Sequence, residues 1–299
     1  MCLSVFLFII ENMKWGIIDV GGGMRDIFGT GVLDACLEKQ IQFDYAIGVS
    51  AGSANLASFL SCQKGRNKRF YTQYAKRKEY MSLSNWIHKK NYLDLDYIYG
   101  TLANSNGEDP MDYETFAKNP TEFEVVCTDA STGKPVYFSK EDMPLDQYDI
   151  LKASSCMPIV CQPYPIYDAL YFDGGISDPI PVERALQKGC DKVVVILTRP
   201  KEEKRNPKKD NLTSKILRKT YRNSGNSLSQ RAYVYNESLK RIQEMEKENK
   251  VCILAPDTIG NMKTLTMDEN CLEDLYQQGQ KQIQKLMEFM QRKTFHIVT

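Results

Sequence analysis

Histidine is scarce in this chain of 299 residues, because only His88 and His296 are present. A Ser-His-Asp hydrolytic triad needs an imidazole to take the serine proton. His88 lies in a basic, surface-like stretch, and His296 lies in a tail that is expected to fray. Neither position favours a catalytic histidine, so a catalytic serine in this chain would need a carboxylate as its base.

An excess of charge and a long apolar run are also absent. Lys and Arg number 39 against 38 Asp and Glu, a net charge of +1, so the overall balance does not indicate a nucleic-acid partner. The apolar run at residues 3–10 is too short to span a bilayer, and it lacks the basic flank and cleavage site of a signal peptide. We expect residues 1–12 to be an extension: either it precedes a native start at Met13, or it forms an edge strand or packs on the surface.

Closely spaced cysteine pairs are missing as well. The nine cysteines are odd in number and scattered, with no Cys-x-x-Cys pair. This distribution argues against a disulfide framework and against a zinc site. Several cysteines, such as Cys127, lie within apolar runs, as core thiols do in a reducing compartment. The sequence therefore predicts a cytoplasmic protein without a bound metal.

Apolar runs alternate with helical stretches along the chain. We expect strands at residues 15–20, 43–49, 123–129, 192–198 and 251–255, and helices at residues 31–39 and 51–62. Strands that are apolar throughout are typical of a sheet buried on both faces, and their alternation with helices predicts a parallel or mixed sheet. We expect one domain over residues 13–260. A helical extension over residues 261–299, with an amphipathic helix at 277–292, is expected to pack on it.

A Gly-x-Ser-x-Gly motif, Gly48 to Gly52, joins a predicted strand to a predicted helix. In this context the motif is typical of a nucleophile elbow, which holds Ser50 exposed on a sharp turn. The flanking glycines lack the Cβ atoms that would clash in such a turn. The amino end of the following helix favours developing negative charge. The motif alone is common, so its interpretation depends on the surrounding segments.

A glycine run follows the first predicted strand: Gly21, Gly22 and Gly23, with Arg25 close behind. Consecutive glycines allow backbone N–H groups to converge on an anion, and the arginine adds positive charge beside them. A dinucleotide-binding loop is the alternative, but Asp26 stands where the Gly-x-G-x-x-Gly fingerprint requires its last glycine. The loop is therefore a candidate oxyanion hole.

An Asp-Gly-Gly segment, Asp173 with Gly174 and Gly175, ends a further predicted strand. The two glycines permit a backbone path that brings Asp173 close to another loop. The alternative is an ordinary Asp-Gly turn. Small residues at 153–155 precede this strand, where they leave room for an acyl chain or simply end a helix before Pro158.

These three motifs, in this order, resemble those of the patatin-like phospholipase family in its bacterial single-domain form, over about residues 14–200. The resemblance implies an α/β fold, a three-layer α/β/α sandwich with a central mostly parallel sheet. It also implies hydrolysis of lipid acyl esters without metal or cofactor. Carried onto this chain, it makes Ser50 the nucleophile, Asp173 the proton acceptor, and the Gly21–Gly23 loop with Arg25 the oxyanion hole.

Two alternatives remain open at this point. An α/β-hydrolase esterase would use a triad of Ser50, Asp173 and His296, whose order in the chain matches that fold. A non-catalytic lipid- or nucleotide-binding protein could share the fold. The family usually has glycine where this chain has Asp26, which bears on the geometry of the loop and on the charge near an oxyanion. Headgroup preference, acyl-chain preference and oligomeric state are not indicated.

Two basic stretches, residues 64–80 and 199–222, interleave cations with aromatic or polar residues. Each is consistent with a solvated surface. Basic residues with aromatic anchors also suit a membrane interface with anionic lipids. We therefore predict peripheral contact with the inner membrane surface through residues 64–80, helped by residues 199–222.

Overall fold

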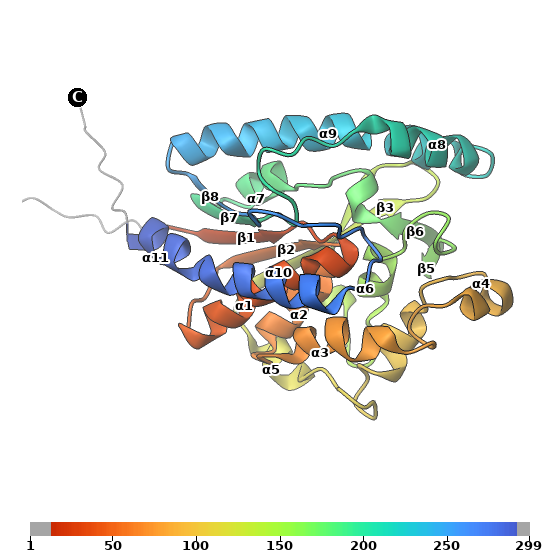
Figure 1. Ribbon diagram of the computed structural model, residues 1–299, viewed down its shortest axis with the longest axis horizontal. Helices are drawn as coiled ribbons and strands as arrows, with labels where there is room; N and C mark the ends of the chain where they lie inside the picture. Colours follow the sequence, from red (N-terminus) through yellow and green to blue (C-terminus); the bar gives the residue numbers. More distant parts are fainter. Residues whose placement is uncertain (1–12, 292–299) are drawn as a thin grey trace, which may run out of the picture.

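The computed structural model describes residues 13–291, so the extension at residues 1–12 and His296 lie outside the described part (Figure 1). Within residues 13–291 lies an eight-stranded sheet with the hydrogen-bonded order β5-β6-β3-β2-β1-β7-β8, and β4 also pairs with β3. The strands are β1 (Trp15–Asp19), β2 (Tyr45–Val49), β3 (Glu122–Asp129), β4 (Pro135–Ser139), β5 (Tyr164–Ile166), β6 (Ala169–Asp173), β7 (Lys192–Ile196) and β8 (Val251–Leu254). Pairing is parallel among β1, β2, β3, β7 and β8, and antiparallel where β4, β5 and β6 join.

Helices cover both faces of the sheet (Figure 1). One layer contains α1, α2, α10 and α11, and the opposite layer contains α7 and the long α9. The helices are α1 (Ile27–Glu38), α2 (Ala51–Leu60), α3 (Arg66–Thr72), α4 (Leu83–Lys89), α5 (Tyr113–Lys118), α6 (Asp149–Ser154), α7 (Val182–Gln187), α8 (Pro207–Leu217), α9 (Arg222–Lys247), α10 (Glu269–Lys281) and α11 (Ile283–Gln291).

The apolar character of the strands has its cause in this double cover. Ile17 and Ile18 follow each other in β1, and both are 0% exposed, yet they belong to separate cores on opposite faces of the sheet. Successive side chains of a strand point to opposite faces, so a strand with helices on both sides needs apolar residues at every position.

The carboxyl ends of β2 and β6 meet beside the middle of β3. β2 pairs with β3 as far as Val126, and β6 pairs with it from Cys127 onward in the opposite direction. β4 overlaps both ranges, from Glu124 to Thr128, and must therefore occupy the other edge of β3. β2 and β6 consequently share one edge and run toward each other, so the residues that follow them emerge at the same point.

The predicted fold class, a three-layer α/β/α sandwich around a mostly parallel sheet, is confirmed. The predicted strands are present as β1, β2, β3, β7 and β8, with ends shifted by up to two residues. The predicted helix at 277–292 is instead two helices that meet at Gln282. The division near residue 260 stays a prediction, although α10 packs closely on α1: a Cβ on Gly279 would lie 2.1 Å from the Phe28 carbonyl oxygen.

Two further features bear on the sequence-based expectations. In the part of the chain that the structure describes, no helix combines the length and apolarity needed to cross a membrane. Nor does any disulfide join cysteines within residues 13–291, where Cys36, Cys127 and Cys190 are buried.

Candidate active site

Ser50 occupies a strained turn between β2 and α2. Its backbone has φ 56° and ψ −131°, a conformation that residues other than glycine rarely adopt. The turn is tight on both sides, because a Cβ on Gly48 would lie 2.3 Å from the Ser53 Cα atom and one on Gly52 would lie 2.4 Å from the Asp19 carbonyl oxygen. Both motif glycines are thus required by close packing, and the Ser50 side chain faces the pockets.

Ser154, at the end of α6, holds this turn against the sheet. The Ser50 amide donates to the Ser154 hydroxyl oxygen at 2.8 Å, and that hydroxyl donates to the Val126 carbonyl oxygen at 2.7 Å. Ser154 therefore ties the elbow to β3 at the point where β2 and β6 meet. In the sequence, the small residues at 153–155 stand out as room for an acyl chain or as the end of a helix. At Ser154 the structure shows hydrogen bonding in place of room for an acyl chain.

Asp173 reaches the same point from β6 and is 6% exposed. Its Oδ1 atom accepts a hydrogen bond of 2.7 Å from the Gly175 amide. Burial raises the pKa of Asp173 above its ordinary value, and hydrogen bonds from the Ser50 side chain and Gly175 offset part of that rise. Gly174 is required beside it, because a Cβ there would lie 2.1 Å from the Val126 carbonyl oxygen.

The glycine loop lies next to Ser50 with positive φ angles of 65°, 145° and 59° at Gly21, Gly22 and Gly23. The Gly21 amide donates to Asp19 Oδ1 at 3.1 Å, and the Met24 amide donates to the Thr264 carbonyl oxygen at 2.8 Å. Within residues 13–291 the amides of Gly22 and Gly23 have no hydrogen-bond acceptor. These two N–H groups are free to bind an anion.

The Ala51 amide also has no acceptor among the described residues, since it begins α2 directly after Ser50. The residue after the nucleophile supplies an oxyanion donor in nucleophile elbows. The Gly-x-Ser-x-Gly motif could have indicated this donor, but the oxyanion hole predicted from the sequence did not include Ala51.

Arg25 and Asp26 follow the loop in the short turn η1 (Gly23–Asp26), and both are buried. Arg25 Nη1 donates to Thr264 Oγ1 at 3.3 Å, and burial lowers the pKa of Arg25 to about 10. The Asp26 carboxyl turns inward against Asp19: a Cβ on Gly29 would lie 2.5 Å from an Asp26 oxygen and 2.8 Å from an Asp19 oxygen.

The Asp19 and Asp26 side chains are each 0% exposed. Burial raises the pKa of Asp19 to about 6, while burial and the neighbouring Asp19 raise the pKa of Asp26 well above its ordinary value. Two carboxyl groups in contact cannot both ionise at low cost, so this pair shares a proton. Asp26 therefore places its carboxyl beneath the elbow, and the glycine loop keeps its three positive φ angles.

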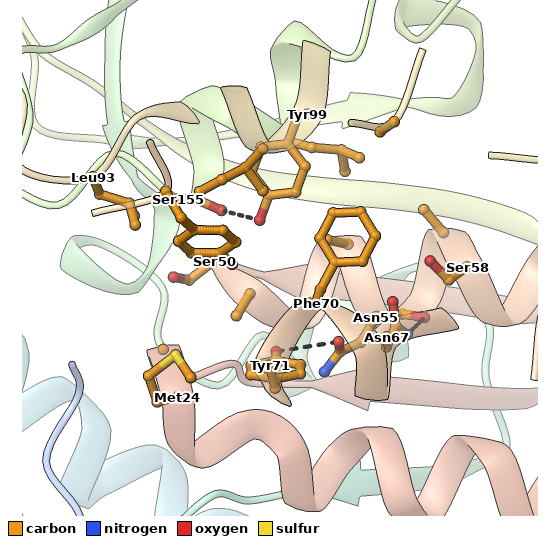
Figure 2. A pocket seen from close by; sticks show the side chains of 18 of the residues that line it. Met24, Ser50, Asn55, Ser58, Asn67, Phe70, Tyr71, Leu93, Tyr99 and Ser155 are labelled. Atoms are coloured by element: carbon orange, nitrogen blue, oxygen red, sulfur yellow. Dashed lines mark hydrogen bonds between the residues drawn. The ribbon is translucent and has the colours of Figure 1, made fainter. Parts of the chain in front are cut away.

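An apolar pocket opens on one side of Ser50. Figure 2 shows Ser50 with Met24, Phe70, Leu93 and Tyr99 around this cavity. The Tyr99 and Ser155 hydroxyls lie 3.2 Å apart, and Tyr71 donates to Asn55 Oδ1 at 3.2 Å. Aromatic and aliphatic walls with few polar groups suit a hydrocarbon chain.

Residues 64–80 form part of the wall of the apolar pocket and do not present an apolar surface to solvent. The aromatic side chains of this stretch are buried: Phe70, Tyr71, Tyr74 and Tyr80. Six of its seven cations form ion pairs with carboxylates: Lys64, Arg66, Lys68, Arg69, Lys76 and Arg77. The aromatic anchors that suggested membrane contact through this stretch are thus taken up by the core and the pocket.

A second, polar pocket also includes Ser50 in its wall, together with Asp173. The two pockets share Gly23, Ser50 and Met157. Arg199, from the second basic stretch, lines the polar pocket, as does Arg231 of α9. These arginines were missed from the sequence, because cations in a basic stretch look the same whether they face a site or solvent.

His88 lies exposed on α4 and lines neither pocket. Among residues 13–291 no group of three or more histidine, cysteine or acidic side chains could hold a metal ion. Among the described residues, the candidate general base beside Ser50 is therefore the Asp173 carboxylate.

Two family models match the chain. The first, patatin-like phospholipase, matches residues 20–186, and the second, a domain of unknown function (DUF6363), matches residues 221–292. An uncharacterized protein of Escherichia coli K12, YjjU, is 32% identical over 189 residues, which are 61% of this chain and 51% of YjjU. The chain thus spans about half the length of this relative. A crystal structure of VipD from Legionella pneumophila matches 92% of this chain and 67% of VipD, with 14% identity and a TM-score of 0.49.

Proposed function

Because the chain belongs to the patatin-like phospholipase family, we propose that it is a serine-dependent lipid acyl hydrolase, with Ser50 as nucleophile and Asp173 as proton acceptor. The observation that carries this proposal is the meeting of β2 and β6 beside β3, which brings Ser50 and Asp173 to the same point of the sheet and into the wall of one pocket. A nucleophile and a base that line one pocket, beside unpaired backbone donors, are the elements of acyl transfer.

In the first step the Ser50 hydroxyl attacks the ester carbonyl carbon while its proton passes to the Asp173 carboxylate. The carbonyl oxygen becomes an oxyanion, and the amides of Gly22, Gly23 and Ala51 donate to it, with Arg25 adding positive charge nearby. Collapse of this intermediate breaks the ester bond, and Asp173 returns the proton to the leaving alcohol.

In the second step a water molecule attacks the acyl-serine ester. Asp173 accepts a proton from that water, and the same donors stabilise the second oxyanion. Ser50 then recovers its proton as the fatty acid leaves. Burial helps Asp173 in both steps, because a raised pKa makes its carboxylate a stronger base than an exposed one.

The apolar pocket supports a lipid substrate. Its side chains would enclose an acyl chain whose carbonyl group lies at Ser50. Burial of each methylene stabilises such a complex by about 0.8 kcal/mol. This interaction makes long-chain esters better substrates than acetate esters.

Active-site labelling tests the proposal. A fluorophosphonate probe should modify the wild-type protein at Ser50 and should fail to modify Ser50→Ala. Labelling of Ser50→Ala to the same extent would contradict the proposal. Comparison of lipids exposed to wild type and to Ser50→Ala would identify the acyl chains that are released.

We also propose that the protein meets its substrate through reversible contact of α4 with a membrane surface. Leu83 is 72% exposed and Ile87 is 64% exposed, and two exposed cations follow them: Lys89, which pairs with Asp94, and Lys90. Met81 precedes α4 and Leu93 follows it, and the two residues form an isolated antiparallel β-bridge. Both line the apolar pocket, so α4 lies next to that pocket in the chain. Apolar side chains beside lysines suit an anionic membrane.

Sedimentation with liposomes measures this contact. Binding should rise with phosphatidylglycerol content and fall as salt screens the lysines. The double substitution Leu83→Asp/Ile87→Asp should weaken binding about tenfold or more, because two large apolar side chains are lost. Tyr233→Asp on α9, which replaces a residue with 56% exposure, is the matched control and should bind like wild type. Equal binding of the double variant and wild type would contradict the assignment to α4.

A further inference from the structure

The apolar pocket has an open end and a closed end. Wall residues that are partly exposed mark the open end, and they include Ser50, Met81, Met157 and Leu265. Wall residues that are at most 8% exposed mark the closed end, and they include Ser58, Arg66, Asn67, Met111 and Tyr148. An acyl chain therefore enters beside Ser50 and extends toward the buried end.

Helix α2 runs along the pocket from one end to the other. Its wall residues repeat at helical spacing, as residues on one face of a helix do: Ala51, Ala54, Asn55, Ala57 and Ser58. Figure 2 shows Ser50 and Ser58 on opposite sides of the Phe70 ring. The advance along the helix axis from Ser50 to Ser58 is about 12 Å. With C–C bonds of about 1.5 Å, an extended chain of about eight to ten carbons covers this distance.

Arg66 closes the buried end with a charged group that is fixed in position. Its side chain is 7% exposed, and its Nε atom lies 3.5 Å from Asp109 Oδ1. Nη1 donates to the Ser58 hydroxyl oxygen at 2.8 Å, and Nη2 donates to the Asp109 carbonyl oxygen at 2.8 Å. The guanidinium group also lies 4.6 Å from the ring centroid of Phe70. These contacts hold the guanidinium group against the end of α2.

An ion-pair network continues from Arg66 away from the pocket. Asp109, which is 6% exposed, accepts from Arg69 Nε at 2.6 Å and Nη2 at 2.9 Å, and from the Tyr74 hydroxyl at 3.2 Å. A longer acyl chain could advance only by breaking hydrogen bonds of buried charges. That cost exceeds the gain from burial of another methylene.

We propose that Arg66, held by Ser58 and Asp109, forms the floor of the apolar pocket and limits the bound part of an acyl chain to about eight to ten carbons. This inference rests on the proposed acyl hydrolase function and adds a chain-length specificity to it. Carbons beyond the limit stay outside the apolar wall, so they add nothing to binding.

A series of saturated p-nitrophenyl esters, from acetate to palmitate in the same detergent, measures the limit. The kcat/KM of wild type should rise by up to about fourfold for each added methylene, because each one is buried in the pocket. The rise should end at about the decanoate ester. A rise that continues to palmitate would overturn the proposal.

Two substitutions should move the limit in opposite directions. Ala54→Leu places a larger side chain in the wall about 6 Å beyond Ser50 along the helix axis, so the rise should end near the butyrate or hexanoate ester. Arg66→Ala removes the floor, while Asp109 keeps its two hydrogen bonds from Arg69, so the rise should extend beyond decanoate.

The matched control is Arg77→Ala in the same basic stretch. Arg77 pairs with Glu108 and lies outside the pocket wall, so this variant should keep the wild-type limit. Each limit is a ratio between esters within one variant, so a general loss of activity does not move it. A folded Arg66→Ala protein with the wild-type limit would overturn the proposal. If Arg66→Ala does not fold, an unchanged limit in Ala54→Leu would overturn it.

Binding of saturated fatty acids to Ser50→Ala, measured by calorimetry, separates the floor from the hydrolase function. Affinity should increase up to about ten carbons and then level off, and adding Arg66→Ala should extend the increase. If wild type cleaves none of the esters, the acyl hydrolase function fails, while this binding profile still supports the floor. Affinity that increases steadily to palmitate would overturn the floor, and neither hydrolysis nor binding would overturn both.

Discussion

Substitution of Ser50 by alanine is expected to reduce kcat/KM for ester hydrolysis by at least about 10⁴-fold, because the covalent step loses its nucleophile. The fold should persist, since the backbone amide that donates to Ser154 is still present in the variant. Steady-state kinetics with a long-chain ester would measure the loss, and thermal unfolding would show that the variant folds. Turnover equal to wild type would contradict the role of Ser50.

The matched controls for this experiment are the two histidines. His88→Ala and His296→Ala should keep wild-type kcat/KM, because the proposed mechanism uses a carboxylate as base. Loss of activity in His296→Ala alone would instead favour the triad of an α/β-hydrolase.

Substitution of Asp173 by asparagine is expected to reduce kcat/KM about 10³-fold, within the range of roughly 10² to 10⁴ for removal of a general base. Asparagine keeps the shape of the side chain and its oxygen can still accept from the Gly175 amide, so the turn should survive. What the variant loses is the ability to take the serine proton. Activity close to wild type would contradict the assignment.

The pH profile of the wild type follows from the same residue. Asp173 must be ionised to act as a base, so kcat/KM should fall as the pH decreases through the pKa of Asp173. Burial raises this pKa, so the fall should begin at a higher pH than for an exposed aspartate. The Asp19 carboxyl also titrates near the site, with a pKa of about 6 that depends on its contact with Asp26. Asp26→Asn is therefore the control, because it changes the pKa of Asp19. An acid limb that is unchanged in Asp26→Asn belongs to Asp173.

The central sheet could be predicted because its strands are buried on both faces, so that β1 and β7 are apolar at nearly every position. Ser50 and Asp173 could be named because glycines mark each turn where a Cβ would collide with backbone. Arg205 could not be assigned to the polar pocket, since only the path of the chain between β7 and α8 distinguishes it from solvated arginines. The short strands β4, β5 and β6 have mixed exposure and gave a weaker pattern.

The buried pair of Asp19 and Asp26 couples the fold to the proton concentration. Both carboxyls ionise in an unfolded chain at neutral pH, whereas the folded pair retains a proton because its pKa values are raised. Folding therefore takes up a proton. The contribution of this pair to the free energy of unfolding is complete below about pH 4, and it is lost as the pH rises through about 6 and above. Catalysis by Asp173 changes in the opposite sense, because it requires a carboxylate that has lost its proton. Acidification thus increases the contribution of this pair to the stability of the fold, while it protonates the base that Ser50 needs.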